Sequence, residues 1–313
     1  MPEPQEQQPA AGTVSISVCI CTFNRAALLE RTLRQLATVR VPSGVCYEVV
    51  VVDNGSIDAT PAVLQALQGT LPLRPVREER LGLSHARNAA ARAARGNLLL
   101  WTDDDVLVEP GWVEGYVRAA TDFPCVGFYG GPVDPWFEGE PPAWLRQSFP
   151  TLGQAYAIRD LPPGTTELSL GSLPYGANFA TRAELHSRLS FDLDLGRVGR
   201  RGGCLSEESS FLQRALELGY SGRWVPESRV AHLIPRERQT LRYLREYFVV
   251  AGSTPTNRGF GGPTLLGRPR WLWRSLVENE LKFWATRWLT GPGTWLPYLR
   301  NAAIARGALR RKG

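Results

Sequence analysis

The sequence contains no apolar run that approaches the roughly 18 residues needed to span a bilayer. Its first twelve residues, MPEPQEQQPAAG, lack both the basic start and the apolar centre of a signal peptide. We therefore expect a cytoplasmic protein with a disordered tail at residues 1–13. An apolar content of 43% and a charged content of 21% are ordinary for a globular chain. At 313 residues it is long enough for one large or two small domains.

Cysteine is scarce, and its five occurrences are an odd number. Most of them lie in apolar surroundings, which favours reduced thiols packed in a core over a disulfide framework. Cys19 and Cys21 are two residues apart in a strand-like run, so they share one face. Because no second pair of cysteines is nearby, we do not expect a zinc site there.

Positive charge is concentrated near the C-terminus. The net charge is +6, but from Thr264 onward ten Lys or Arg residues stand against only Glu278 and Glu280, a net +8. The preceding residues therefore sum to about −2. A basic excess confined to one segment argues against a general nucleic-acid surface, and nucleic acid is not an expected partner.

Strand-like and helix-like patterns alternate along the first third of the chain. Apolar β-branched runs predict strands, and apolar residues three or four apart predict helices. The expected strands are Val14–Phe23, Tyr47–Ser56 and Asn97–Thr102, and the expected helices are 24–39, Asp58–Leu67 and 85–95, the last ended by Gly96. This order predicts a parallel α/β sheet, in which ligands bind at the carboxyl ends of the strands.

Three aspartates stand at such a strand end in LLLWTDDDVLVEP, residues Leu98–Pro110. Adjacent carboxylates need a positive partner, and Mg²⁺ or Mn²⁺ fits because it binds carboxylate oxygens and leaves positions for phosphate. In an extended segment Asp103 and Asp105 point the same way and Asp104 points oppositely. The alternative is a solvated acidic turn.

Three further residues point to nucleotide binding, each with a plainer alternative. Asp53, in VVVDNGSIDAT, ends a strand where its carboxylate can bond a base or a ribose, although DNGS also suits an Asx turn. Arg87 and Asn88, in RLGLSHARNAA, lie early in a helix and suit a nucleotide or a phosphate. Their alternative is an ordinary surface helix face.

The combination of motifs is more specific than its parts. The chain contains, in order, SVCICTFNRAALLERTLRQL, EVVVVDNGSIDAT and GLSHARNAAARAARGNLLLWTDDDVLVEPGWV, followed by PYGANFATRAEL, LSEESSFLQRALELGY and WVPESRVAHLIPRER. Together they resemble the family 2 glycosyltransferases of the GT-A fold over about three quarters of the chain, Ser15 to Gly252.

This resemblance implies an α/β fold with a GT-A (Rossmann-like) mixed, mostly parallel sheet flanked by helices. The glycosyltransferase domain would cover residues 14–255, with a nucleotide-binding part at 14–110 and an acceptor part at 111–255. Residues 264–313 would form a basic, tryptophan-rich helical extension.

The resemblance also assigns roles in binding the donor. Asp53 matches the aspartate that binds the nucleotide base. Asp103 and Asp105 match the two ends of the DXD motif, because Pro110 lies five residues beyond Asp105. Asp103 would face the ribose, and the expected ligands of Mg²⁺ or Mn²⁺ are Asp105, Asp103 and His232, although a lone histidine is often structural. The other expected donor-site residues are Thr22, Asn24 and Arg25 on the first nucleotide-binding loop, Arg87, Asn88 and Asp104, Gly176, Ala177 and Asn178 in the sugar and acceptor pocket, and Arg236 and Arg238 near the diphosphate.

The family's catalytic base is usually the Asp of a Glu-Asp pair that opens a helix. Here the pair is Glu207-Glu208, so Glu208 occupies the position of the base with one extra methylene. A carboxylate needs only hydrogen-bond reach to the acceptor hydroxyl, so Glu208 can serve, and the choice between the two stays open. The alternative is that both acids only complement the helix dipole.

Two loops and a helix complete the predicted acceptor part. Residues 134–171 are rich in Pro, Gly and Trp, and we expect long loops there that form a lid or an acceptor wall. The basic, glycine-rich segment Gly196–Leu205 is a candidate loop that closes on the donor, or an ordinary mobile loop. Residues 206–220 are expected to be helical, with Ser206 as N-cap and Gly219 as the stop.

The C-terminal segment carries an apolar stripe with helical spacing: Trp273, Val277, Leu281, Trp284 and Trp288. It is basic, rich in tryptophan and too short to span a bilayer, which suits the interface of an anionic membrane. The alternatives are a helix that packs its aromatics on the catalytic domain or pairs with a second subunit.

We therefore expect an inverting glycosyltransferase that works in polysaccharide or glycoconjugate synthesis. It would move a sugar from a nucleotide-diphosphate sugar, with a UDP-sugar as first choice, to a hydroxyl of a saccharide or lipid-linked acceptor. The site would lie in the cytoplasm, at the inner face of the cell membrane if the C-terminal segment binds lipid. One alternative is a nucleotidyltransferase, but CTFNRAALLER does not resemble a triphosphate-binding loop. The other is a non-catalytic nucleotide-sugar-binding subunit.

Overall fold

The computed structural model describes residues 14–195, 207–253 and 263–310, and these residues form two compact units. Unit 1 comprises residues 14–134, 159–195 and 207–232, and unit 2 comprises residues 135–158, 233–253 and 263–310. This division differs from the expected boundary at residue 255. The C-terminal helices do not stand alone but share a unit with two earlier segments. The predicted tail at residues 1–13 lies outside the described residues.

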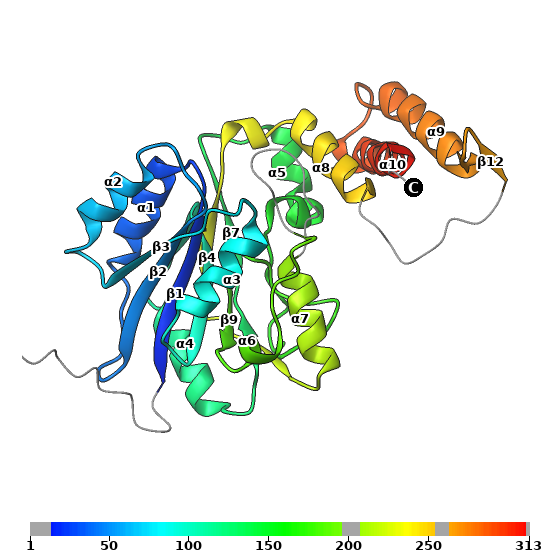
Figure 1. The fold of residues 1–313 in the computed structure, drawn as a ribbon. Coiled ribbons are helices and arrows are strands. Elements are labelled where there is room, and N and C mark those ends of the chain that lie inside the picture. Colours follow the sequence, from blue (N-terminus) through cyan, green and yellow to red (C-terminus); the bar gives the residue numbers. More distant parts are fainter. Residues whose placement is uncertain (1–13, 196–206, 254–262, 311–313) are drawn as a thin grey trace, which may run out of the picture. The chain divides into compact units, whose positions relative to one another are not determined.

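Unit 1 is built on an eight-stranded mixed sheet (Figure 1). The strand order is β3-β2-β1-β4-β9-β6-β10-β8. Strands β1, β2, β3 and β4 pair in parallel, and β9 runs antiparallel to both β4 and β6. The strands are β1 (Ser15–Thr22), β2 (Cys46–Asp53), β3 (Leu73–Arg77), β4 (Leu98–Asp103), β6 (Phe128–Gly130), β8 (Glu167–Leu168), β9 (Phe179–Arg182) and β10 (Gly222–Trp224). The expected mixed, mostly parallel α/β sheet is confirmed.

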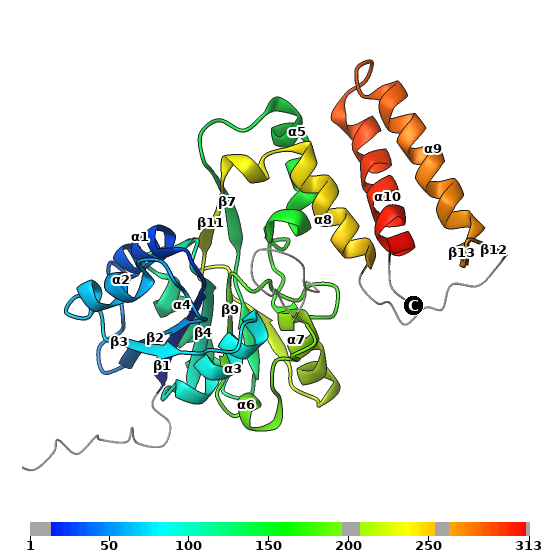
Figure 2. The same ribbon diagram turned by 45° about the horizontal axis from the view of Figure 1, so that its top comes forward.

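Helices cover both faces of this sheet. Figures 1 and 2 show α1 and α2 on one side of β1–β3 and α3 on the other. Alternate strand residues, including Cys19, Val50 and Val52, share a buried cluster with the small side chains Ala86 and Ala90 of α3. The helices of unit 1 are α1 (Ala26–Leu36), α2 (Thr60–Leu67), α3 (Leu83–Ala93), α4 (Trp112–Asp122), α6 (Leu185–Arg188) and α7 (Glu207–Glu217).

The expectation that Gly96 ends α3 is wrong. The helix ends at Ala93, and Ala94 is already extended. Gly96 serves a packing purpose instead, because a Cβ atom there would lie 2.6 Å from the backbone of Ile16 and of Ser17 in β1. The glycine therefore lets the chain pass close to β1 on its way into β4.

A second sheet has three strands in the order β5-β11-β7, which are β5 (Val106–Val108), β11 (Val230–Ile234) and β7 (Val133–Phe137). Strand β5 follows the three aspartates directly and pairs antiparallel with β11. Both β7 and β11 continue along the chain from unit 1 into unit 2.

Unit 2 is mostly helical. Helix α10 packs along both α8 and α9, as Figure 2 shows. A buried cluster that includes Leu145, Leu244, Phe283, Trp295 and Leu299 joins these helices to α5. The elements are α5 (Ala143–Leu152), η1 (Gly153–Tyr156), η2 (Arg236–Arg238), α8 (Leu241–Ser253), β12 (Thr264–Leu265), β13 (Arg268–Pro269), α9 (Arg270–Thr286) and α10 (Pro292–Arg310).

Two glycines explain why α10 belongs with α8. A Cβ atom at Gly252 would clash with the carbonyl oxygen of Ile304, and one at Gly307 would clash with the carbonyl oxygen of Val249. Only glycine lets the two helix backbones approach this closely. Among the described residues, no helix combines the length and the apolar character that crossing a membrane would require.

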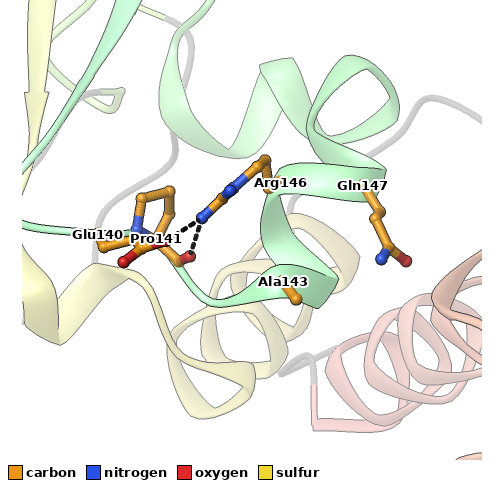
Figure 3. Close-up of a pocket in the computed structure, with 5 residues that line it drawn as sticks. All are labelled: Glu140, Pro141, Ala143, Arg146 and Gln147. Atoms are coloured by element: carbon orange, nitrogen blue, oxygen red, sulfur yellow. Dashed lines mark hydrogen bonds and ion pairs between the residues drawn. The ribbon is translucent and has the colours of Figure 1, made fainter.

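The expectation of irregular loops across residues 134–171 is partly wrong, because α5 and η1 lie there. A hollow of about 490 Å³ in unit 2 is lined by Glu140, Pro141, Ala143, Arg146 and Gln147 (Figure 3). Arg146 and Glu140 form an exposed ion pair of 2.8 Å at this hollow. None of the predicted site residues lines it.

Candidate active site

The predicted donor-site residues of unit 1 meet at one edge of the large sheet. Thr22 is paired with Asp53 at the ends of β1 and β2, and Cys21 is paired with Asp103 at the ends of β1 and β4. Parallel strands thus bring residues from three separate motifs to neighbouring positions. This confirms the expectation that Asp53 and the three aspartates share the carboxyl edge.

Arg25 is the positive partner of two of the aspartates. Its Nη1 atom lies 2.6 Å from Oδ1 of Asp104 and 3.0 Å from Oδ2 of Asp105. The hydroxyl of Thr22 donates a 2.8 Å hydrogen bond to the other carboxylate oxygen of Asp104. Burial raises the pKa of Asp104 to about 6, and the charge of Arg25 opposes this rise. Charge in this acidic cluster is thus balanced by a residue that lies about 80 positions earlier in the chain.

The expected alternation of side chains along the three aspartates is wrong. Strand β4 ends at Asp103, and Asp104 and Asp105 form a turn before β5 begins at Val106. Because the backbone is not extended there, Asp104 and Asp105 both reach Arg25, and both are buried. Asp103 is the most exposed of the three aspartates, and its carboxylate contacts Arg87.

Asp105 also contacts His232. The pairing of β5 with β11 sets His232 opposite Val106, and its Nε2 atom lies 3.3 Å from Oδ1 of Asp105. Within the described residues, no three His, Cys, Asp or Glu side chains form a cluster that could hold a metal ion. One carboxylate with an imidazole still fits a divalent cation whose remaining ligands are water and substrate phosphate. Asp103 contacts Arg87 at 3.7 Å, and its role as a metal ligand stays a prediction.

The carboxylate of Asp53 is buried and has two partners. Its Oδ1 accepts a 2.8 Å hydrogen bond from the backbone N–H of Ser56, so the Asx-type turn considered as an alternative does form. Its Oδ2 accepts a hydrogen bond from Nη1 of Arg77, whose Nε donates to Glu79. Sequence reasoning missed Arg77. The signal was available in principle, because Arg77 ends the strand next to β2 and is paired in register with Asp53.

Asn24 fastens two site loops together. It adopts a left-handed backbone conformation, with φ of 52°. Its N–H donates to the hydroxyl of Ser56 at 2.9 Å, and its side-chain oxygen accepts the N–H of Ile57 at 2.8 Å. These bonds join the loop after β1 to the loop after β2, so Asn24 positions Arg25 and Asp53 relative to each other.

Arg87 is buried between the donor-side and the base-side carboxylates. Its Nη1 lies 3.1 Å from Glu207 and 3.7 Å from Glu208, and its Nη2 lies 3.7 Å from Asp103. Nη1 lacks the alignment of a hydrogen bond to any described acceptor. A Cβ atom at Gly176 would clash with Nη2, so Gly176 provides the space that Arg87 occupies. The sequence pointed to both residues but not to their contact.

Glu208 has the properties expected of a general base. Its side chain is 13% exposed, whereas that of Glu207 is 5% exposed, so Glu208 is the more accessible carboxylate. Burial and the neighbouring negative charge of Glu207 raise the pKa of Glu208 to about 7, while Arg87 lowers it. A carboxylate with a pKa near neutrality is well matched to accept a proton from a hydroxyl.

The side chain of Asn178 does not line a pocket, which corrects the expectation. Asn178 is fully buried, and its amide makes four hydrogen bonds of 2.7 to 2.9 Å. It accepts from Trp112 and Tyr116 and donates to the carbonyls of Pro132 and Ser228. No donor or acceptor of this amide remains for a ligand.

Asn88 is similarly engaged by the protein itself. Its amide donates to the carbonyl of Phe191 and accepts from the N–H of Phe191, both at 2.8 Å. This reciprocal pair fixes the segment before α7. Direct contact of Asn88 with a nucleotide stays a prediction.

Arg236 and Arg238 do not belong to unit 1 with the other predicted site residues. Arg236 belongs to unit 2, where its guanidinium packs against Gly139, and Arg238 lies in the same 3₁₀ turn. Their contact with a diphosphate stays a prediction. The loop at 196–205 and the N-cap Ser206 lie outside the described residues. Gly219 follows α7 with φ of +86°, as expected for a helix stop.

Comparison with known proteins identifies the family. The family model described as "Glycosyl transferase family 2" matches residues 17–181, more than half of the chain. The succinoglycan biosynthesis protein ExoM of Rhizobium meliloti is 27% identical over 250 residues, which are 77% of this chain and 74% of that protein.

Two solved structures share the fold. A mannosyltransferase of Pyrobaculum calidifontis, in complex with GDP-Man and Mn²⁺, has a TM-score of 0.54 at 20% identity and covers 96% of this chain and 87% of its own. GalNAc-T7 with UDP, GalNAc and Mn²⁺ has a TM-score of 0.53 at 20% identity and covers 80% of this chain and 53% of its own. These likenesses and the mixed α/β sheet agree with the GT-A fold. With its matched family model and its carboxylates gathered at the sheet edge, the chain belongs to glycosyl transferase family 2.

Proposed function

We propose that this glycosyltransferase moves a sugar from a nucleoside diphosphate sugar to a hydroxyl of a saccharide or lipid-linked acceptor, with inversion at the anomeric carbon. The observation that carries the proposal is the position of Arg87, which contacts Asp103 on the donor side and the pair Glu207-Glu208 on the opposite side. The candidate base Glu208 is thus separated only by Arg87 from Asp103, at the edge where a donor would bind.

The donor base would be read by Asp53. A carboxylate accepts hydrogen bonds only, so it selects a base edge with an N–H group, such as N3–H of uracil or N1–H of guanine. Arg77, bound to the same carboxylate, could donate to the neighbouring base carbonyl. A UDP-sugar remains the first choice, and the GDP-Man and UDP bound to the two related structures show why GDP must be tested beside it.

Asp105 and His232 would hold Mg²⁺ or Mn²⁺. When bound there, such a cation would supply positive charge that stabilises the leaving diphosphate. Mn²⁺ is present in both structures that share the fold, which supports a divalent cation at this site. Arg25, which is paired with Asp104 and Asp105, would hold these carboxylates in place.

Glu208 would remove the proton from the acceptor hydroxyl. As the carboxylate of Glu208 takes up this proton, the oxygen of the acceptor hydroxyl would attack the anomeric carbon from the face opposite the diphosphate. Burial, Glu207 and Arg87 would together set the pKa of Glu208, and the two neighbouring side chains would also orient it. The non-catalytic subunit considered earlier would not need a carboxylate with this pKa.

The class of product and the cellular location are also part of the proposal. The relative named for succinoglycan biosynthesis supports a role in polysaccharide or glycoconjugate synthesis. We propose a cytoplasmic site of action at the inner face of the cell membrane, reached through unit 2. The free thiols of Cys19, Cys21, Cys46 and Cys125 are consistent with a reducing compartment.

Calorimetric titration tests the donor site. UDP, GDP and dTDP are each titrated with and without Mn²⁺ into the wild type, Asp105→Asn and the control Asp122→Asn, an exposed aspartate elsewhere in unit 1. We expect metal-dependent binding of one nucleotide, lost in Asp105→Asn and kept in Asp122→Asn. No binding of any nucleotide with metal present would overturn the proposal.

Glu208→Gln separates the enzyme from a binding subunit. We expect this variant to bind the donor nucleotide as the wild type does and to lose turnover by about 10²–10⁴-fold, the usual contribution of a general base. Unchanged turnover would exclude Glu208 as the base and reopen Glu207.

A further inference from the structure

Helix α9 presents an exposed apolar face that no described residue covers. Val277, Leu281 and Trp284 lie on one side of α9, and Trp288 lies in the turn that follows the helix; the four side chains are between 53% and 76% exposed. We call these four residues the tryptophan face. The helix and its continuation therefore leave two tryptophans largely in contact with water, which is costly unless something covers them.

The opposite side of α9 accounts for its packing within unit 2. Leu272 and Phe283 are buried there, and α10 packs along that side. Glu280 also faces inward, where it forms ion pairs with Arg306 at 2.7 Å and Arg245 at 3.4 Å. The exposed face is thus not needed to hold α9 in place.

The charges that remain around the tryptophan face are mostly positive. Glu278 is neutralised by Arg274, at 2.6 Å. With Glu280 paired on the inner side, Arg270 and Arg287 are left without an ion-pair partner among the described residues. Lys282 lies on the side of α10, where its ammonium is 5.8 Å from the ring centroid of Tyr298. The tryptophan face is therefore apolar at its centre and cationic at its margins.

Arg287 joins the two properties. Its guanidinium lies 5.6 Å from the ring centroid of Trp284 and 4.5 Å from that of Trp288. A cation held over indole rings at a water boundary can bind an anion on its other side while the rings enter an apolar phase. Indole groups favour such boundaries because they have an apolar body and a polar N–H.

A short hairpin extends the apolar surface at the start of α9. Leu265 and Leu266 are exposed, and the indole N–H of Trp273 donates a 3.0 Å hydrogen bond to the carbonyl of Leu265. The bond fastens the hairpin β12–β13 to the helix. Exposed apolar groups thus occur at both ends of α9.

We propose that the tryptophan face of α9 docks unit 2 on the surface of a bilayer that contains anionic lipids. The helix would lie in the plane of the interface, with its indoles at headgroup depth and its basic margins against lipid phosphates. This inference does not depend on the proposed glycosyl transfer.

Charge decides against a second copy of the chain as the occupant. A two-fold contact through this face would bury Arg287 of both copies, while Glu278 and Glu280 of α9 are already paired with Arg274 and Arg306. Like charges in a desolvated contact are strongly unfavourable. Anionic headgroups supply the missing negative charge along the whole helix.

Vesicle binding by the full chain tests the proposal. The wild type is sedimented with vesicles of phosphatidylcholine alone or mixed with 30% phosphatidylglycerol, at about 0.1 M and about 0.5 M NaCl, where the Debye length falls well below 10 Å. We expect binding to the mixed vesicles, at least tenfold weaker binding to neutral vesicles, and weakening in high salt. Equal binding to both vesicle types would overturn the anionic requirement, and no binding to either would overturn the proposal.

Matched variants locate the contact. Leu281→Ser with Trp284→Ser removes two exposed side chains of the tryptophan face, and the control Trp271→Ser removes an exposed tryptophan on another side of α9. We expect at least a tenfold loss of vesicle binding in the double variant and none in the control, with unchanged far-UV circular dichroism in both. Full binding by the double variant would overturn the assignment to this face.

Arg287→Gln tests the cationic margin, and size measurement tests the rival occupant. We expect Arg287→Gln to weaken binding to the mixed vesicles severalfold and to reduce its dependence on salt. In light scattering, we expect the wild type and the double variant to have the same oligomeric state. The result against the proposal would be a dimer that forms in the wild type and is lost in the double variant. Such a dimer would assign the face to a second copy and overturn the lipid contact.

Discussion

The guanidinium of Arg87 lies 3.1 Å from the carboxylate of Glu207, and both side chains are buried. Buried charges of this kind are costly unless they are paired, so the contact couples the position of α3 to the start of α7. Arg87 is also 3.7 Å from both Asp103 and Glu208. A change at Asp103 can therefore alter the position or the charge environment of Glu208 through Arg87 alone.

The turnover of the wild type should depend on the protonation of Glu208. Burial and Glu207 raise the pKa of Glu208 from its ordinary 4.5 to about 7. Below pH 7 the carboxylate takes up a proton and can no longer act as a base, so turnover should fall as the pH is lowered through about 7. The rate of nucleotide release from the donor sugar between pH 5 and 9 measures this. Nucleotide affinity at each pH is the control, and a flat profile would rule out Glu208 as the titrating base.

Replacing Arg87 should move that profile to higher pH. Arg87 lowers the pKa of Glu208, and its removal in Arg87→Met leaves burial and Glu207 unopposed. We expect the midpoint of the pH–rate profile to rise by about 1–3 units, the usual effect of one nearby opposite charge. Arg87→Lys keeps the charge and should shift the midpoint less. A purely structural role for Arg87 would lower the rate without moving the midpoint.

The sequence predicted the first half of unit 1 well because the signals there are local. Runs such as VVVV in β2 and the leucine spacing of α1 define their elements without help from distant residues. Helix α5 was missed because Pro150 and the surrounding Pro, Gly and Trp residues obscure its periodicity. A local pattern also does not reveal that the chain turns after Asp103 at the end of β4. The predicted orientation of the Asp104 side chain was therefore wrong.

The contacts that the site residues make could not be predicted from the sequence for another reason. Arg25 meets Asp104 and Asp105 across about 80 residues of chain, and Arg77 meets Asp53 only because β2 and β3 are neighbours in register. Asn178 matched a pocket motif by position, but the fold surrounds its amide with four protein partners. Residue types predicted the chemistry of the edge, whereas pairing depended on topology.

Asn178→Ala should destabilise unit 1. It would leave the indole N–H of Trp112 and the hydroxyl of Tyr116 without an acceptor, and two backbone carbonyls without a donor. Each buried unsatisfied group costs about 1–3 kcal/mol, so we expect a loss of at least about 3 kcal/mol in the free energy of unfolding. Urea unfolding followed by tryptophan fluorescence measures it. The control is Asn279→Ala in α9, where the half-buried amide donates to the carbonyl of Ser275 one turn earlier, so the change should be much smaller.

Gly176→Ala should reduce turnover through Arg87. The added methyl group would clash with Nη2 of Arg87, which is buried and therefore has to shift away from Asp103 or from Glu207. We expect at least a tenfold lower kcat and a changed pH midpoint. Gly171→Ala adds the same methyl group where nothing lies within 4 Å and should behave as the wild type. If Gly176→Ala kept full kcat and the wild-type midpoint, the space around Arg87 would not matter for the reaction.

Two glycines of α10 should respond to alanine in opposite ways. Gly293 has nothing within 4 Å of a Cβ atom, so Gly293→Ala should be neutral or stabilise by up to about 1 kcal/mol, the gain in helix propensity. At Gly307 the methyl group would meet the carbonyl oxygen of Val249 in α8, and this overpacking should cost about 1–3 kcal/mol despite the same gain. Thermal unfolding followed by helical circular dichroism compares the two variants. A stabilised Gly307→Ala would show that α8 and α10 are not held in the close contact that defines unit 2.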